Sequence, residues 1–252
     1  MKGKLLAYSL GLMAFSLAGC EPTYMSSDST VHVDSLHEVA LTYGAQSGLA
    51  WKAKNINMTL EKNADTLDKI YDFNALMLQG NLMPPVIDQA FDTVNSSDYD
   101  TMRSSTREIS IIKPAGLVTA APTWRSYLYM TYKTPDKINS SLYPTTSEEQ
   151  EVWEKALLKG WEQGVTQAQD MFEEALGVLN RDFKGMVLYH KLLLQNIVSS
   201  PYASTAHMGV TGDSSMLRIN DKVTRITAQA ELNASQVEQW QPIIEINGST
   251  HG

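Results

Sequence analysis

The stretch SEEQEVWEKALLKGWEQGVTQAQDMFEEALGVLN, residues 147–180, predicts a long amphipathic helix that dominates the fold. Ser147 precedes Glu148, Glu149 and Gln150, which is the spacing of a capping box with carboxylates at the positive end of the helix dipole. At 1.5 Å of rise per residue, this helix is about 50 Å long. Its apolar residues recur at spacings of three and four: Trp153, Leu157, Trp161, Val165, Ala168, Phe172, Ala175 and Leu179.

Two more helices are expected, one on each side of this stretch. GMVLYHKLLLQNIV, residues 185–198, is apolar nearly all round and predicts a separate buried helix after Arg181-Asp182, ended by Ser199-Ser200-Pro201. It is too short to cross a membrane, because a helical span needs roughly 20 apolar residues. Earlier in the chain, Ser35-Leu36-His37-Glu38 has capping-box spacing and predicts a helix to about Asp68.

Extended segments are expected in the remaining parts of the chain. Residues 69–78, 81–87 and 106–113 read as strands, whereas residues 123–130 predict a short helix before a loop over 133–144. Residues 202–232 are β-rich, with predicted turns at 211–213 and 220–221 and a half-buried strand at 223–227. The sequence therefore predicts an α+β fold, a single domain of long helices packed with one small mixed or antiparallel sheet.

Glycines at helical spacing are a second feature of the helices. Gly160 and Gly164 are four residues apart in the long helix, as Gly44 and Gly48 are in the first. Each glycine inside a helix costs about 1 kcal/mol relative to alanine, so a compensating close contact is expected. The two strips would then let helices approach closely, within one chain or between copies. The alternative is that these glycines lie on a solvated face.

The only cysteine of the chain ends an apolar run near the N-terminus. Lys2 and Lys4 precede this run, which has the anatomy of a secretory leader. Its end, Leu17-Ala18-Gly19-Cys20, resembles the bacterial lipobox, in which the cysteine is lipidated and becomes the first residue. We expect residues 1–19 to be a signal peptide and 20–33 a flexible tether. Glu21 favours the outer membrane over the inner one, and the alternative is a free thiol in an ordinary leader.

Composition excludes several function classes. Twenty Lys and Arg against 28 Asp and Glu give a net charge of −8, with no basic run, which argues against direct binding of nucleic acid. A lipidated Cys20 leaves no thiol for catalysis, for a disulfide or for a cysteine metal site. The apolar fraction of 43% is enough for a sizeable core in one domain, expected over 34–232, followed by a loosely ordered tail over 233–252.

Two residue pairs have spacings that occur in functional sites. Ser110 and Lys113 match the SxxK spacing of penicillin-recognising serine enzymes, but in a strand these positions point to opposite faces. We therefore do not expect a catalytic pair. Asp98 and Asp100 offer two carboxylates to a hard cation, and the alternative, which we favour, is that both are solvated.

Two further candidates are a turn and a lone histidine. Residues 212–215, GDSS, could bind an anion through backbone amides, although a plain turn explains them as well. His190 lies in an apolar run and is expected to be a hydrogen-bonded core histidine rather than a ligand. The sequence thus predicts no catalytic, cofactor or metal site and no enzymatic activity.

Six blocks of the sequence resemble the DotC family, the lipoproteins of type IVB secretion and conjugation machines, called TraI on IncI-type conjugative plasmids. The resemblance covers about residues 36–231 in unbroken order. The blocks are LTYGAQSGLAWKAKNIN (41–57), LDKIYDFNALML (67–78), APTWRSYLYM (121–130), EEQEVWEKALLKGWEQGVTQA (148–168), RDFKGMVLYHKLLLQNIV (181–198) and GVTGDSSMLRINDKVTRITA (209–228).

The resemblance implies a structural role in the outer-membrane core complex. Such proteins lie beside a DotD-like lipoprotein and a secretin-like DotH protein, whose placement in the outer membrane depends on the two lipoproteins, and many copies form a ring. The family supplies no active-site residues and only the lipidated cysteine, which matches Cys20. Trp124, Trp153 and Trp161 are candidate interface anchors or core residues. A hydrolase of cell wall or glycan and a solute-binding lipoprotein remain as alternatives.

Overall fold

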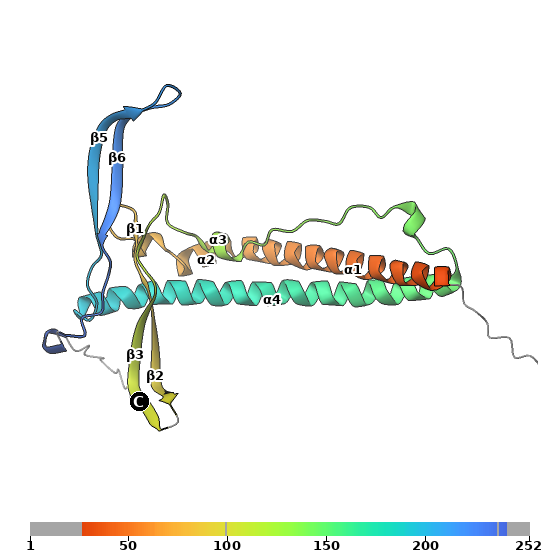
Figure 1. Cartoon of the computed structure of the whole chain (residues 1–252), viewed down its shortest axis with the longest axis horizontal. Helices are drawn as coiled ribbons and strands as arrows, with labels where there is room; N and C mark the ends of the chain where they lie inside the picture. Colours follow the sequence, from red (N-terminus) through yellow and green to blue (C-terminus); the bar gives the residue numbers. More distant parts are fainter. Residues whose placement is uncertain (1–26, 99, 236, 241–252) are drawn as a thin grey trace, which may run out of the picture.

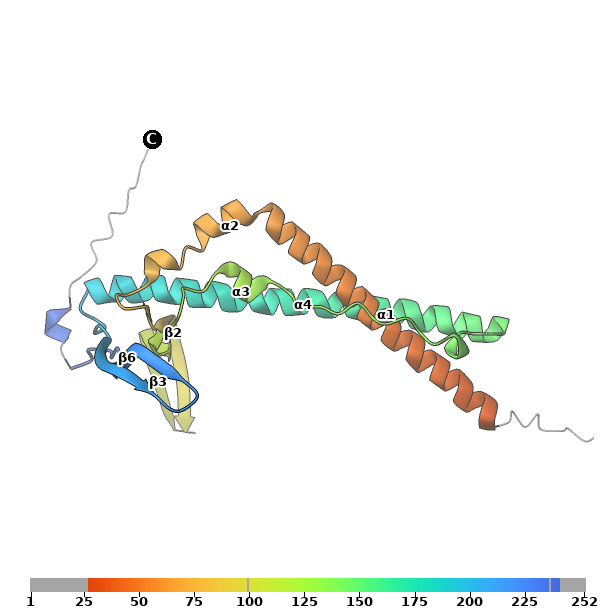
Figure 2. The ribbon, with the colours of Figure 1, turned by 90° about the horizontal axis from the view of Figure 1, so that it is seen from above.

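Two long helices form a rod with β-hairpins at one end (Figure 1). The structure is a computed structural model that describes residues 27–98, 100–235 and 237–240. Helices α1 (Ser27–Lys62) and α4 (Ser147–Leu194) run in the same direction, and Figure 2 shows that they cross obliquely. The predicted α+β fold is confirmed, with long helices and small antiparallel sheets in a single domain.

Helix α4 is one continuous helix of 48 residues, about 72 Å long at 1.5 Å per residue. Its N-cap is Thr146, whose side chain accepts from the Glu149 amide, so the predicted capping box is one residue too late. The Glu149 carboxylate accepts from the amides of Thr145 and Thr146, which lowers its pKa. The N-terminus of α4 is thus fixed by its own sequence.

The predicted break of α4 at Arg181-Asp182 is wrong. Leu179, Asp182, Met186 and Tyr189 are all buried at spacings of three and four, so the buried stripe of the helix continues across this position. The prediction of a helix buried all round is also wrong, because Val187 is 45% and Leu194 is 80% exposed. The helix ends before Asn196, which has a positive φ.

Helix α1 differs from the prediction at both ends. It begins at Ser27 rather than Ser35, so Ser35 and Glu38 lie inside the helix and the end of the predicted tether is helical. It ends at Lys62, because the chain turns at Asn63 before the short helix α2 (Ala64–Ile70). The apolar face of α4 packs against α1 between Leu36 and Leu60, a contact that a local capping signal does not reveal.

Short elements fill the chain between the hairpins and the helices. The predicted strand over 69–78 is wrong, because this segment contains the end of α2 and a 3₁₀ turn, η1 (Asn74–Leu76). The predicted short helix is confirmed as α3 (Trp124–Leu128), and the loop that follows returns along α1 through a second 3₁₀ turn, η2 (Ser140–Leu142). The other short elements are β1 (Leu82–Met83), β4 (Gly116–Leu117) and η3 (Val237–Gln239).

Two long hairpins contain most of the strand residues. The first is β2 (Val86–Asp98) with β3 (Thr101–Lys113), and the second is β5 (Tyr202–Gly212) with β6 (Leu217–Ala228). Within the described residues they form separate two-stranded antiparallel sheets, as β1 and β4 also do. The expectation of one common sheet is therefore wrong. The two hairpins project in opposite directions from the same end of α4 (Figure 1).

The predicted turn at Asn220-Asp221 is wrong, because both residues lie inside strand β6. Asn220 has φ 56° and Gly209 on the facing strand has φ 75°, and the pairing register shifts here, so these residues form an irregularity within the hairpin. The real turn follows Gly212, as predicted. The predicted strand at 223–227 is confirmed as part of β6, but its half-buried face is not, because Val223 is 44% exposed and only Ile226 is partly buried.

The largest buried cluster lies where α1, α3, α4 and β2 meet. It contains Leu60, Phe73, Val86, Trp124, Leu128, Leu179 and Met186. A second cluster, around Ile87, Tyr189, Leu192 and Val198, joins the base of β2 to the end of α4. The core therefore lies along the rod and at the bases of the hairpins, and their distal halves lie outside it.

Candidate interaction surfaces

The four glycines of the sequence analysis lie at the crossing of α1 and α4. A Cβ atom on Gly44 or Gly48 would overlap the backbone carbonyl oxygen of Leu157 or Trp161, respectively. A Cβ on Gly160 or Gly164 would overlap the carbonyl oxygen of Leu41 or Ala45 in the same way. Both strips therefore make the close contact between the two helices of one chain, and they hold the rod together.

Aromatic side chains flank this crossing. The Trp51 and Trp161 rings lie 5.6 Å apart between centroids, and Trp51 is 52% exposed. Trp153 is buried against Leu36 and Ala40 of α1, near the start of α4. Trp124 is fully buried in the largest cluster. Of the predicted candidate anchors, Trp153 and Trp124 thus lie in the core and Trp161 lies at its edge.

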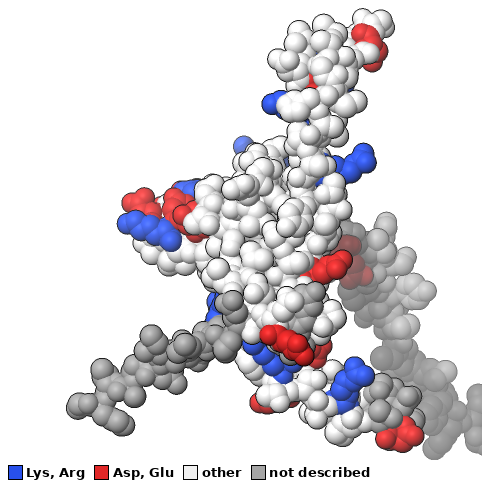
Figure 3. Space-filling view, turned by 90° about the vertical axis from the view of Figure 1, so that its left-hand side faces the viewer, with Lys and Arg blue, Asp and Glu red and all other residues white. Residues whose placement is uncertain are grey.

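Hairpin β5–β6, here called the β5–β6 arm, exposes nearly all of its side chains. Val210 of β5 pairs directly with Ile219 of β6, and Leu217 lies two residues from Ile219, so the three side chains share one face of the distal half. They are 64%, 69% and 66% exposed, respectively. Figure 3 shows this arm as a projection with few charged groups. An apolar face thus stands in solvent at the end of the arm.

The turn of the β5–β6 arm is fixed by Asp213. Its carboxylate accepts hydrogen bonds from the Ser215 hydroxyl and from the amides of Ser215 and Met216, at 2.7, 2.8 and 3.0 Å. The bond from the Ser215 hydroxyl, followed by those from the two amides, lowers the pKa of Asp213. Because this carboxylate occupies these amide donors, they do not form the candidate anion site at 212–215.

Hairpin β2–β3, here called the β2–β3 arm, is anchored on α4 at its base. A Cβ on Gly185 would overlap the Val86 side chain and crowd the Ile87 backbone, so this glycine lets β2 lie directly on the helix. Val86 and Ile87 are both buried. Further along, Val94 and Met102 share one face by the strand register and are 61% and 73% exposed. The arm is thus fixed at one end and exposed at the other.

A buried carboxylate joins the base of the β2–β3 arm to α4. Asp182 has a side chain that is 2% exposed, and Lys113 at the end of β3 donates to it at 2.5 Å. Arg181 donates to the second oxygen at 3.0 Å, and the Tyr127 hydroxyl donates at 3.3 Å. Burial, with the nearby negative charge of Asp182, raises the pKa of Tyr127 to about 12. The cluster links α3, α4 and β3.

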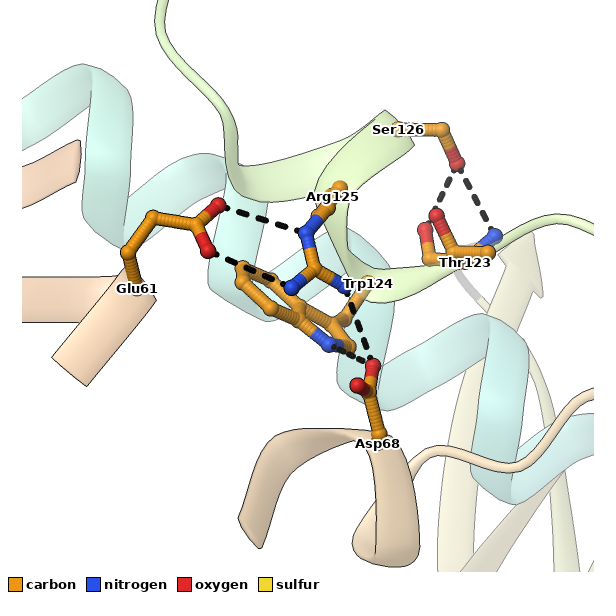
Figure 4. A network of polar contacts seen from close by, with 6 residues as sticks. All are labelled: Glu61, Asp68, Thr123, Trp124, Arg125 and Ser126. Atoms are coloured by element: carbon orange, nitrogen blue, oxygen red, sulfur yellow. Dashed lines mark hydrogen bonds and ion pairs between the residues drawn. The ribbon is translucent and has the colours of Figure 1, made fainter. Parts of the chain in front are cut away.

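A second polar network connects α1 and α2 through α3 (Figure 4). Arg125 of α3 donates to Glu61 at the end of α1 and to Asp68 of α2, at 3.2 and 3.1 Å. The Trp124 indole also donates to Asp68, at 2.6 Å. The guanidinium carbon lies 4.2 Å from the centroid of the Trp124 ring. This network therefore links α1, α2 and α3.

Comparison with protein families identifies the chain. The model of a family described as type IV secretory system, conjugal DNA-protein transfer matches residues 31–242, which cover the rod, both arms and the short elements between them. The chain belongs to this TraI family. It is therefore a protein of a type IV secretion and conjugation system. The comparison with curated proteins gave no match.

The TraI-family fold separates the candidate catalytic residues. Lys113 is engaged by Asp182, whereas Ser110 lies opposite Asp88 in the exposed part of the β2–β3 arm. His190 contacts the Leu76 carbonyl oxygen at 2.9 Å and is half-buried, as a hydrogen-bonded structural histidine would be.

Neither a metal-binding cluster nor a membrane-spanning helix is present in the part of the chain that the structure describes. Within the ranges that the structure describes, no three His, Cys, Asp or Glu side chains are grouped so that they could hold a metal ion. Asp98 and Asp100 lie at the tip of the β2–β3 arm, on either side of residue 99. No helix in the described part of the chain is both long and apolar enough to cross a bilayer. Cys20 lies outside the described residues.

The arms are the feature of this TraI-family protein that sequence reasoning missed. Strands were predicted in parts of both arms, and the one at 223–227 was expected to be half-buried, but long projecting hairpins were not predicted. Gly209 lies opposite Asn220-Asp221 in the middle of the second β segment. Because residues with positive φ interrupt a regular strand, these residues were the sequence signal that the strand is irregular. Alternation of apolar residues does not distinguish a core-facing strand from one that faces a partner.

Proposed function

We propose that this TraI-family protein is a structural subunit of the secretion apparatus and has no catalytic activity. The observation that carries the proposal is the pair of exposed arms on a rod of two long helices. Apolar side chains such as Val94 and Ile219 stand in solvent on these arms, and exposed apolar surface of this kind is typical of sites that bind other proteins. The buried charge of Asp182 is engaged in joining elements of the fold.

The proposed subunit is anchored by lipid at Cys20 to the periplasmic face of the outer membrane. The lipobox-like sequence Leu17-Ala18-Gly19-Cys20 and the following Glu21 support this placement. Helix α1 begins at Ser27, so only residues 21–26 separate it from Cys20. At no more than about 3.5 Å per residue, such a segment spans about 20 Å, and the rod would begin close to the membrane.

The proposed partners are a DotD-like lipoprotein and a DotH-like secretin-type protein. In this proposal the subunit helps to place the DotH-like protein in the outer membrane, where the channel is built. The resemblance to the DotC family supports these partners. The net charge of −8 supports a role that does not include direct contact with nucleic acid.

Co-purification from detergent-solubilised outer membranes tests this function. An affinity-tagged full-length chain should recover the DotD-like and DotH-like proteins, and deletion of its gene should remove the DotH-like protein from the outer-membrane fraction. A hydrolase or a solute-binding lipoprotein would instead be recovered alone, and the DotH-like protein would reach the membrane normally without it. That result would overturn the proposal.

A Cys20→Ser variant tests the anchor separately. Labelled palmitate should be incorporated into the unsubstituted chain and not into the variant, which should leave the outer-membrane fraction. Placement of the DotH-like protein should be lost with it. Equal labelling of the two chains, or an unchanged membrane fraction, would contradict the lipid anchor while leaving the partner test intact.

A further inference from the structure

Both arms leave strand edges and faces without a partner inside the described chain. Each arm is a two-stranded sheet, and among the described residues no third strand pairs with either one. An isolated two-stranded hairpin is at best marginally stable in water, and its free backbone groups are a template for another strand. The distal halves of both arms therefore have the properties of surfaces that are covered in the assembled state.

The two arms have matching lengths and faces. The β2–β3 arm has strands of 13 residues each, and the β5–β6 arm has strands of 11 and 12 residues. One face of the first arm presents Val94 and Met102, whereas one face of the second presents Val210, Leu217 and Ile219. Each arm thus presents exposed apolar side chains in its distal half.

Their charges have opposite signs. Residues 86–113 contain five acidic and three basic residues, and one of the basic residues, Lys113, is already paired with Asp182. Residues 202–228 contain three basic residues, Arg218, Lys222 and Arg225, and two acidic ones. Of those two, Asp213 is bonded within its own turn and Asp221 accepts from Thr211. The first arm is therefore acidic and the second is basic.

We propose that the β5–β6 arm of one copy packs on the β2–β3 arm of a second copy of this chain. The two arms of one chain project in opposite directions, so this contact forms between chains (Figure 1). The contact joins two different surfaces, which makes it heterologous, and its repetition gives a closed ring or an open row of subunits. The inference rests on the proposed structural role, but it assigns this surface to a copy of the same chain rather than to another protein.

Engineered cysteines test the contact, because Cys20 is the only native cysteine in the chain. Val94→Cys and Ile219→Cys change exposed side chains, so both variants are expected to fold. In intact membranes, a chain with both substitutions should give a crosslinked ladder of dimers, trimers and larger species. A mixture of the two single variants should give dimers only, and each single variant alone should stay monomeric.

Three results would overturn the proposal. Dimers from a single variant alone would show that each arm meets its own equivalent, and a doubly substituted chain that crosslinks only to a protein of another size would assign the arm to that protein. An absence of any crosslink would also overturn the proposal. Co-purification of the DotD-like and DotH-like proteins with the unsubstituted chain is measured in parallel, so failure of this contact is distinguishable from failure of the proposed function.

Charge reversal provides a second test. Arg218→Glu with Lys222→Glu should reduce the yield of the ladder at least tenfold, because both arms then carry negative charge. Adding Asp88→Lys and Glu108→Lys, which share one face of the β2–β3 arm, should restore it. Lys155→Glu with Lys159→Glu makes the same change in charge near the start of α4 and should leave the ladder unchanged. A ladder that is insensitive to all of these changes would contradict the role of charge.

Discussion

The backbone carbonyl oxygen of Ala45 lies where a Cβ atom on Gly164 would have to be. The contact joins α1 to α4 at the crossing of the rod, and three other glycines make equivalent contacts. A helix pays about 1 kcal/mol for each internal glycine, so four of them at one crossing indicate that the close approach of the two backbones stabilises the rod by more than this cost.

Gly164→Ala should lower the free energy of unfolding by about 1–3 kcal/mol, because the new methyl group forces the helices apart. Gly177→Ala is the matched control on the same helix, since a Cβ there would meet nothing within 4 Å. It should raise the free energy of unfolding by about 1 kcal/mol. Urea denaturation followed by circular dichroism measures both. Effects of the same sign would contradict the role assigned to the crossing.

Replacement of Lys113 by methionine should loosen the base of the β2–β3 arm. The substitution removes a hydrogen bond between charged groups while Arg181 still neutralises Asp182, so a loss of about 1–3 kcal/mol in stability is expected. Hydrogen exchange at 109–113 should become faster, whereas exchange in the β5–β6 arm should not change. Uniform acceleration over both arms would show that the ion pair supports the whole fold instead.

Tyr127 should make the protein sensitive to alkaline pH. Its pKa is about 12 in the folded protein against 10.0 for the ordinary side chain, so between these values the unfolded chain loses the proton first. The contribution of Tyr127 to stability is therefore constant below about pH 10 and falls as the pH rises from 10 to 12. Tyr127→Phe should show a shallower decrease in this window, measured by urea denaturation at each pH. Equal slopes would contradict the raised pKa.

Asp213→Ala should open the turn of the β5–β6 arm, because the amides of Ser215 and Met216 lose their acceptor. Asp213→Asn keeps an acceptor oxygen and should retain the turn. The pKa of Asp213 is lowered in the folded protein, so its contribution is present above pH 3.8 and lost as the pH falls further. Amide exchange of Ser215 and Met216 measures each effect, and identical exchange in the two variants would contradict this assignment.

Local signals predicted the parts of the fold that depend on neighbours in sequence. The i, i+4 spacing of Gly160 and Gly164 indicated a close helix contact, although its partner could have been another copy. The Arg181-Asp182 pair looked like a break, because Lys113, the partner of the buried Asp182, is 69 residues away along the chain. Asn220 was predicted to be in a turn, because a residue with positive φ is found in β-bulges as well as in turns.

Apolar strand residues were the main source of error about the site. Val210 and Ile219 have the β-propensity of core residues, yet each is more than 60% exposed. Burial depends on what covers a face, and for these residues the described chain provides no cover. A single sequence therefore predicts that a β-hairpin forms. It does not reveal whether the hairpin packs against the same molecule or against another one.

The length of α4 has a mechanical consequence. Helix α1 begins at one end of the rod and both arms leave from the other (Figure 1), and α4 spans about 72 Å between them. Any protein bound to an arm is therefore held at a fixed distance from the N-terminal end of α1. Lengthening α1 and α4 together by seven residues would move that bound protein outward by about 10 Å, so the rod works as a molecular spacer.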